Sequence, residues 1–200
     1  MENQPKGTPS DRLLGPLRQA FFDFGYEQPT MGVLATSCGV TRRTLYNHFS
    51  NKEEAFRAML RWRHGIEIAA GLAAGQRVLA AGGSPLDAVV TVMDVRYAEA
   101  RRDLEGSPHA VEINYTAFRR CRDVMSHSAA VFQDRLAELL ADLAVRDLVR
   151  LRPGVTPAAL SQYLCDGARG VNQTLPPQPP GTLPERYRAM FTAILFGCCD

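Results

Sequence analysis

Residues 30–52 read TMGVLATSCGVTRRTLYNHFSNK, and their spacing is typical of a helix-turn-helix. Thr30 and Thr41 stand where the N-caps of two short helices are expected, because a threonine hydroxyl accepts the free backbone N–H groups at a helix start. Gly39 lies between the two helices and can adopt the positive φ of a sharp turn. Residues 33–35 are expected to face inward, and the alanine that ends this run allows the second helix to cross closely.

The second short helix has an outward face made only of hydrogen-bonding groups. Leu45 and Phe49 anchor the helix to the core by a four-residue step. The residues left outside are Thr41, Arg42, Arg43, Thr44, Tyr46, Asn47 and His48. A helix of this size fits the major groove of DNA, where such side chains contact base edges and phosphates. The alternative interpretation is a polar surface helix without a ligand, which leaves the combination of turn glycine, inward alanine and capped helices unexplained.

The distribution of charge agrees with an anionic partner at this end of the chain. The net charge is +2, but residues 1–64 hold 9 Lys and Arg against 6 Asp and Glu, whereas residues 65–200 hold 14 against 15. The positive surplus therefore lies in the segment that contains the helix-turn-helix pattern.

The composition excludes several other classes of protein. With 46% hydrophobic and 22% charged residues in 200, the chain has an average globular composition. The first residues lack the apolar segment of a signal peptide, and no stretch reaches the ~18–20 apolar residues of a membrane span, so we expect a cytoplasmic protein without a membrane partner. The five cysteines are scattered and form no CxxC pair. We therefore predict no disulfide framework, no metal site and no cofactor.

Apolar residues recur at helical spacing nearly everywhere, and alternating period-2 runs are absent. This pattern predicts an all-α fold of about nine helices. Pro16 lies inside the first helical pattern, where proline removes a backbone donor. Two alternatives follow: the first helix is kinked at Pro16, or it begins near Gly15.

Several further helix starts can be predicted from their caps. Ser50, with Glu53 three residues later, predicts a capping box at the start of a long helix. The run Ser-Pro-Leu-Asp at residues 84–87 combines a cap, a proline at the first helical position and an acid in the first turn. Later helices are expected at residues 109–126 and 132–143.

Residues 45–56, LYNHFSNKEEAF, and residues 24–40, FGYEQPTMGVLATSCGV, resemble two stretches of TetR-family transcriptional regulators. The resemblance covers residues 12–60, where some ten positions agree in fixed register. It implies a three-helix DNA-binding domain over residues 1–50, joined through a fourth helix to a helical effector-binding and dimerisation domain over residues 51–200. Arg43 and Pro16 depart from the family pattern, where a small residue and a helix former are usual.

The resemblance also implies roles for individual residues. Tyr46, His48 and Lys52 are expected to contact phosphates, and Lys52 lies at a helix N-terminus, which also attracts anions. The alternatives are a partly buried His48 beside Phe49 and a solvated Lys52. The candidates for base contacts are Arg42, Arg43, Thr44 and Asn47. Thr30 and Thr41 are caps first, although either can also meet a phosphate.

The second part of the chain shows no catalytic constellation, so we predict that the protein is not an enzyme. His109 and Glu112 lie three residues apart and can share a helix face, a spacing that also arises by chance. A set of polar and aromatic residues is expected to line an effector pocket with mostly apolar walls. This set is Trp62, Tyr97, His109, Glu112, Tyr115, Phe118, Arg122, Met125 and Asn172. The alternative for each of them is core or surface.

The last two predicted helices have the character of an interface. Gly167 and Gly170 make one strip small enough for close helix approach, and the final helix has an apolar face. The predicted homodimer interface consists of Gly167, Gly170, Tyr187, Met190, Phe191 and Ile194. The resemblance to the TetR family implies that two such helices from each subunit form a four-helix interface. The alternative is packing within one chain only.

These observations lead to a functional hypothesis. We expect a transcriptional regulator that binds pseudo-palindromic double-stranded operator DNA as a homodimer. The resemblance further implies a repressor that is released by a small apolar or aromatic effector. The rivals within the same class are an activator and a regulator with no natural effector. From a different class, the rival is a helical enzyme or small-molecule carrier that does not regulate through DNA.

Overall fold

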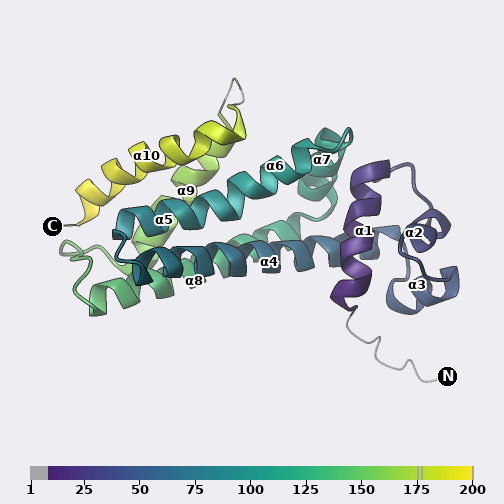
Figure 1. The fold of residues 1–200 in the computed structure, drawn as a ribbon, viewed down its shortest axis with the longest axis horizontal. Coiled ribbons are helices and arrows are strands. Elements are labelled where there is room, and N and C mark those ends of the chain that lie inside the picture. Colours follow the sequence, from purple (N-terminus) through teal and green to yellow (C-terminus); the bar gives the residue numbers. More distant parts are fainter. Residues whose placement is uncertain (1–8, 175, 177, 200) are drawn as a thin grey trace. The chain divides into compact units, whose positions relative to one another are not determined.

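A computed structural model describes residues 9–174, 176 and 178–199. The α-helices are α1 (Asp11–Phe24), α2 (Met31–Ser37), α3 (Arg42–His48), α4 (Lys52–Ala80), α5 (Pro85–Met93), α6 (Ala100–Glu105), α7 (Ala110–Arg120), α8 (Arg122–Val145), α9 (Pro157–Asn172) and α10 (Leu183–Cys198). A π-helical segment η1 (Asp94–Glu99) joins α5 to α6, and a 3₁₀ turn η2 (Pro180–Thr182) precedes α10. The predicted all-α class is confirmed (Figure 1). In the described part of the chain, strand-like pairing is limited to one bridge between Leu151 and Cys199.

The chain forms two compact units that do not follow the expected boundary at residue 50. The first unit consists of the chain up to His64 together with Leu104–Ser126, and the second of Gly65–Asp103 together with the chain from His127 onward. The reason lies in α7, which packs into the same hydrophobic core as α1. The helices α4 and α8 each begin in the first unit and continue into the second. None of the described helices is long and apolar enough to cross a membrane.

One of the two helix starts predicted from a capping box agrees with the structure, and the other is shifted. Ser84 and Asp87 form the expected capping box of α5. The long helix α4 begins one residue later than predicted, because Asn51 rather than Ser50 receives the backbone N–H of Glu54, at 2.8 Å. The Glu54 carboxylate in turn accepts from the Ser50 backbone N–H at 2.6 Å. The cap is therefore Asn51 rather than Ser50, and the Glu54 carboxylate accepts from Ser50, the residue before the cap.

The structure decides between the two alternatives for the first helix, and it shifts one expected helix break. The first helix begins at Asp11 and includes Pro16, so the alternative start near Gly15 is wrong. The expected break between residues 126 and 132 lies instead at Cys121, a single residue whose φ of −120° and ψ of 31° separate α7 from α8. Apolar spacing continues across Cys121, which is buried, so periodicity alone did not reveal this break.

The core of the first unit is rich in aromatic rings. The ring of Phe56 meets the rings of Phe21 and Tyr26 edge to face, each at 5.0 Å between centroids. Leu34 and Leu45, one from each helix of the helix-turn-helix, are fully buried in the same core. This packing fixes the two short helices, which are too short to be stable in isolation.

The second unit is built around close helix approach. Gly71 and Gly75 of α4 lie directly against α5: a Cβ added at Gly75 would be 2.4 Å from Cγ2 of Val92. Phe132 of α8 and Tyr187 and Phe191 of α10 are fully buried in its core. The rings of Tyr187 and Phe191 stack at 5.8 Å.

Candidate nucleic-acid interface

The helix-turn-helix has the predicted local geometry. The hydroxyl of Thr30 accepts from the backbone N–H of Val33 at 3.3 Å, and that of Thr41 accepts from Thr44 at 3.1 Å. Gly39 has a φ of +65°, which an L side chain adopts only with strain. The expected N-caps at Thr30 and Thr41 and the expected turn at Gly39 are confirmed. Val33 differs, because its side chain is 40% exposed and does not face the core.

The outward face of α3 is polar and accessible. Thr41, Arg42, Arg43, Tyr46 and Asn47 are exposed, and Thr44 and His48 are half-buried. The Arg42 guanidinium lies 5.4 Å from the centre of the Tyr46 ring, which braces both side chains on this face. This arrangement has the donors, acceptors and aromatic surface that a groove of DNA can accept.

Near each of the two helix starts, one threonine hydroxyl hydrogen remains available to a ligand. Because Thr30 receives a backbone N–H through its oxygen, its own hydroxyl hydrogen remains available. The Thr41 hydroxyl has a second neighbour, the Thr44 hydroxyl at 2.9 Å, and one of the two donates to the other.

The Nδ1 atom of His48 is buried and has no hydrogen-bond partner among the described residues, and its ring lies 6.1 Å from that of Phe49.

Lys52, at the start of α4, is held by the loop that connects α1 and α2. Its ammonium donates to the Glu27 carbonyl at 2.8 Å and lies 4.9 Å from the centre of the Tyr26 ring. Lys52 is therefore oriented rather than freely solvated. An ammonium has three donors, so this hydrogen bond is compatible with a phosphate contact.

The predicted pocket residues of the first unit are either exposed or engaged in individual side-chain contacts. Tyr115 and Phe118 are 59% and 55% exposed, because α7 turns this side away from its unit's core. Arg122 is also exposed. The Trp62 indole donates to Asp11 at 2.8 Å, and Met125 lies 3.3 Å from the His64 ring.

Two other predicted pocket residues belong to the contacts between α7 and the α1–α2 loop. His109 and Glu112 do share a helix face, with Nδ1 of His109 3.3 Å from the Glu112 carboxylate. That carboxylate also accepts from the backbone N–H groups of Tyr26 and Glu27. Both side chains therefore face the loop.

Tyr97 and Asn172, the remaining two, lie in the second unit. Tyr97 meets Phe132 edge to face at 5.8 Å, and its ring faces the guanidinium of Arg96 at 5.1 Å. Burial raises the pKa of Tyr97 to about 12. The Asn172 amide donates to the Ala168 carbonyl within α9 at 3.0 Å. These contacts make both residues part of the packed interior.

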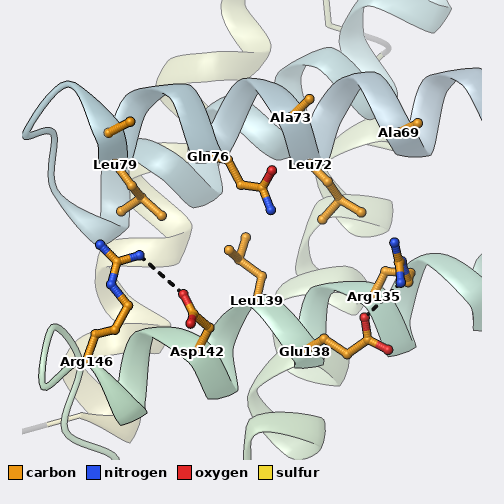
Figure 2. Close-up of a pocket in the computed structure, with 11 residues that line it drawn as sticks. Ala69, Leu72, Ala73, Gln76, Leu79, Arg135, Glu138, Leu139, Asp142 and Arg146 are labelled. Carbon is orange, nitrogen blue, oxygen red and sulfur yellow. Dashed lines mark hydrogen bonds and ion pairs between the residues drawn. The ribbon is translucent and has the colours of Figure 1, made fainter.

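A cavity of about 550 Å³ does exist in the second unit, between α4 and α8 (Figure 2). None of the nine predicted residues lines it. Leu72, Leu79 and Leu139 provide apolar surface, and Gln76 points into the space between the helices. Two ion pairs along α8 border it, Arg135 with Glu138 at 3.1 Å and Arg146 with Asp142 at 3.2 Å. Sequence reasoning missed this cavity because alanines and leucines at these positions also suit ordinary helix packing.

The predicted interface residues divide between the interior and the surface of α9 and α10. Tyr187 and Phe191 are fully buried within the chain, so they cannot meet a partner as expected. Gly167 also packs internally, because a Cβ there would lie 2.5 Å from the sulfur of Met190 and 3.4 Å from Ile194. Gly170 faces open space. The surface of these helices instead presents Tyr163, Gly170, Ala189, Thr192, Ala193 and Phe196.

Ion pairs, and no metal-ligand cluster, are found among the remaining charged side chains that the structure describes. Among the described residues, no group of three or more His, Cys, Asp or Glu side chains is arranged to hold a metal ion. Arg57 of α4 forms an ion pair with Asp123 of α8, and Arg120 of α7 pairs with Glu27 at 3.5 Å and Glu53 at 4.0 Å. These pairs connect residues 66 or more positions apart, and no local sequence signal reveals them.

Comparisons with known proteins agree with this geometry. The model of the bacterial regulatory proteins of the tetR family matches residues 17–59. No curated protein matches the chain. A solved structure from Mesorhizobium loti, described as a TetR-family transcriptional regulator, is 13% identical, with a TM-score of 0.69 over 99% of this chain and 100% of that chain.

Two further solved structures are similar over nearly the whole chain. SmeT, the repressor of the Stenotrophomonas maltophilia multidrug efflux pump SmeDEF, is 18% identical, with a TM-score of 0.63 over 98% of this chain and 92% of that chain. Thermus thermophilus FadR, a TetR-family transcriptional repressor in complex with lauroyl-CoA, is 19% identical, with a TM-score of 0.63 over 94% and 93%. At these identities the likeness shows the fold.

The capped helices, the turn at Gly39 and the polar face of α3 define a helix-turn-helix protein of the DNA-binding class. More particularly, the chain carries a TetR-family domain at residues 17–59 on the fold of the TetR-family transcriptional regulators.

Proposed function

We propose that this chain is a sequence-specific transcriptional repressor that binds operator DNA through α3. The observation that carries the proposal is the outward face of α3, where Arg42, Arg43, Tyr46 and Asn47 are all exposed on a helix anchored by buried Leu45. Arginine suits guanine and asparagine suits adenine in the major groove. Tyr46, His48, Lys52 and the two cap hydroxyls would contact phosphates.

We propose further that the functional form is a homodimer on a pseudo-palindromic site. The exposed residues Ala189, Thr192, Ala193 and Phe196 recur at helical spacing along α10, and Phe196 is 79% exposed. The small side chains in this stripe would allow close approach to a partner helix. Because a two-fold axis repeats the recognition helix, the operator would be an inverted repeat.

The cavity between α4 and α8 is our proposed effector site. Its volume of about 550 Å³ lies within the range of small-molecule sites. The apolar surface with polar groups at its border suits a molecule with an apolar body and one or two polar groups. Two structures with this fold were solved with small molecules that contain an apolar part, FadR with lauroyl-CoA and SmeT with triclosan. An effector that favoured one position of α4 would act on Lys52 at the start of that helix.

Selection of duplexes from a random pool, followed by binding measurements over a range of salt, tests operator binding. An inverted repeat should be enriched, and Arg42→Ala and Asn47→Ala should each relax preference at particular base pairs by about 1–3 kcal/mol. Arg150→Ala, which removes an exposed charge in the second unit, is the matched control and should bind as the wild type does. If no duplex is preferred over single strands, the rival enzyme or carrier hypothesis gains and the repressor proposal fails.

Filling the cavity tests the effector proposal. Ala73 lines the cavity and Ala70 does not, and both lie on α4. A screen by thermal shift with fatty acyl and aromatic compounds should find ligands whose binding is lost in Ala73→Trp and kept in Ala70→Trp. Each ligand should also weaken operator binding, and the operator should weaken the ligand by the same factor. Equal retention of every ligand by both variants would place the effector site elsewhere.

A further inference from the structure

Glu112 of α7 makes three contacts with groups around the loop that connects α1 to α2. One carboxylate oxygen, Oε1, accepts from the backbone N–H of Tyr26 at 2.9 Å and from that of Glu27 at 2.7 Å. The other oxygen, Oε2, lies 3.3 Å from Nδ1 of His109. A charged acceptor makes stronger hydrogen bonds to backbone N–H groups than a neutral one does. The loop thus depends on a side chain that is 85 positions distant in sequence.

The backbone at Gly25 leaves the space that this carboxylate occupies. Gly25 has a φ of +74°, and a Cβ there would lie 2.3 Å from Oε2 of Glu112 and 2.9 Å from Nδ1 of His109. A side chain at position 25 would therefore be excluded both by backbone conformation and by contact with Glu112. The loop and the carboxylate fit one another closely.

Neighbouring contacts hold the same two segments together. The Ser107 hydroxyl donates to the Phe22 carbonyl at 2.5 Å, near the end of α1, and accepts from the His109 backbone N–H at 3.0 Å. At the other end of α7, Arg120 pairs with Glu27 at 3.5 Å. Burial alone would raise the pKa of Glu112, but the N–H groups of Glu27 and Tyr26, together with His109, hold it below its ordinary value, so the side chain is a carboxylate at neutral pH.

We propose that Glu112 is a positioning residue for operator recognition, because it fixes the loop that sets the placement of the helix-turn-helix. This inference rests on the proposed DNA-binding function. The loop leads directly to Thr30, the N-cap of α2, and its Glu27 carbonyl receives the Lys52 ammonium. Loosening residues 26–27 would release the start of α2. It would also release the side chain of Lys52, our proposed phosphate contact.

The position of Glu112 in the chain allows a change in the second unit to affect the loop between α1 and α2. Residues 104–126 belong to the first unit, and α8 continues from this segment into the second unit, where the proposed effector cavity lies. A displacement of α8 would reach the loop through α7 and Glu112, without acting through α4. The chain therefore has covalent connections from the second unit to the first besides the one through α4.

Three variants on α7 isolate the role of the carboxylate. Glu112→Ala removes both acceptors, Glu112→Gln keeps one oxygen that can receive the two N–H groups, and Asn114→Ala alters an exposed residue of the same helix. The measurements are amide exchange at Tyr26 and Glu27, and the affinities for the selected operator and for a random duplex of equal length.

Glu112→Ala should speed exchange at these two amides by about tenfold or more while exchange at Phe56, in the core of α4, stays as in the wild type. Its operator affinity should fall by about three- to tenfold, and its affinity for the random duplex by less than twofold. Glu112→Gln should keep both the exchange rates and the operator affinity close to those of the wild type, because it retains an acceptor. Asn114→Ala should change neither.

The outcomes distinguish this inference from the proposed function. If the wild type prefers no duplex, the proposed function fails, whereas the exchange data still show whether Glu112 holds the backbone of Tyr26 and Glu27. If the wild type selects an operator and Glu112→Ala binds it within twofold of the wild type, the positioning role is overturned. Should Glu112→Ala not fold, Glu112→Asp replaces it. The shorter side chain withdraws the carboxylate by one methylene, so the same increase in amide exchange and the same loss of operator affinity are expected.

Discussion

Gly71 of α4 and Val92 of α5 bring two helix backbones into direct contact. A Cβ at position 71 would lie 2.9 Å from the Val92 carbonyl oxygen and 3.5 Å from Cβ of Arg96. The neighbouring Gly75 repeats the arrangement one turn later, against Ala88 and Val92. Gly65, in the same helix, has nothing within 4 Å. One helix therefore contains a glycine that packing requires and a glycine that it does not.

This difference predicts opposite effects of the same substitution. Gly65→Ala should stabilise the protein by about 0.5–1 kcal/mol, because alanine loses less entropy than glycine in a helix. Gly71→Ala should destabilise it by about 1–3 kcal/mol, since the backbone carbonyl of Val92 cannot rotate away as a flexible side chain would. Chemical denaturation of the two variants beside the wild type gives both values. A stabilised Gly71→Ala would mean that α4 and α5 separate easily.

Removing the Lys52 ammonium should weaken binding to all duplexes by a similar factor. Lys52→Ala removes the ammonium that we propose contacts a phosphate, and it also removes the hydrogen bond to the Glu27 carbonyl. The slope of log K against log salt should become shallower by about 1, because one fewer counterion is released. Titrations of the selected operator and a random duplex at several salt concentrations provide the measurement. A loss confined to the operator would show that Lys52 acts on base recognition and not on the backbone of DNA.

Two phenylalanines of α10 should respond differently to a carboxylate. Phe191 is fully buried inside the chain, so Phe191→Asp should unfold the second unit, because an unpaired charge is costly to bury. Phe196 is 79% exposed, so Phe196→Asp should keep the helical content and the melting temperature of the single chain. If the outer face of α10 forms the dimer, Phe196→Asp should sediment as a monomer and bind the operator poorly. A folded Phe196→Asp that remains dimeric would require a different interface.

The pair of Asp87 and Arg188 should make stability depend on acid pH. Hydrogen bonds from the Ser84 hydroxyl, followed by that from Arg188 at 2.5 Å, lower the pKa of Asp87 to about 2. Because the folded pKa is lower than the ordinary value near 4, the contribution to stability is complete above about pH 4 and disappears as the pH falls toward 2. Melting curves between pH 5 and pH 2 should show a smaller decline for Asp87→Asn than for the wild type. Arg188→Ala should give an intermediate decline, and parallel curves for all three would contradict the assignment.

The local features of the helix-turn-helix were predictable because they depend on neighbours in sequence. Thr30 and Thr41 cap the helices that follow them, and Gly39 needs only its own backbone geometry. The capping box at Ser84 and Asp87 is of the same kind. The cap of α4 was misplaced by one residue, since Ser50 and Asn51 are both good caps and the sequence does not rank them.

The interior partners of the longer helices could not be predicted in the same way. Apolar spacing indicates which side of a helix is buried, but not against what. Tyr115 and Phe118 have the composition of pocket residues and are exposed, whereas Tyr187 and Phe191 have the composition of an interface and are core. Glu112 is the clearest example of a contact that the sequence does not predict. Its partners are backbone N–H groups 85 and 86 positions away, and no sequence pattern indicates that these groups are free to bind it.

The hydrogen bond between Trp62 and Asp11 has a spectroscopic consequence. Trp62 is the single tryptophan of the 200 residues, and its indole N–H lies 2.8 Å from the Asp11 carboxylate, in the first unit. Its fluorescence therefore reports the state of the DNA-binding unit alone, whereas far-UV circular dichroism sums the helices of both units. Melting curves from the two signals will coincide if the units unfold in one cooperative step. If the curves separate, the fluorescence curve gives the stability of the DNA-binding unit directly, without any added label.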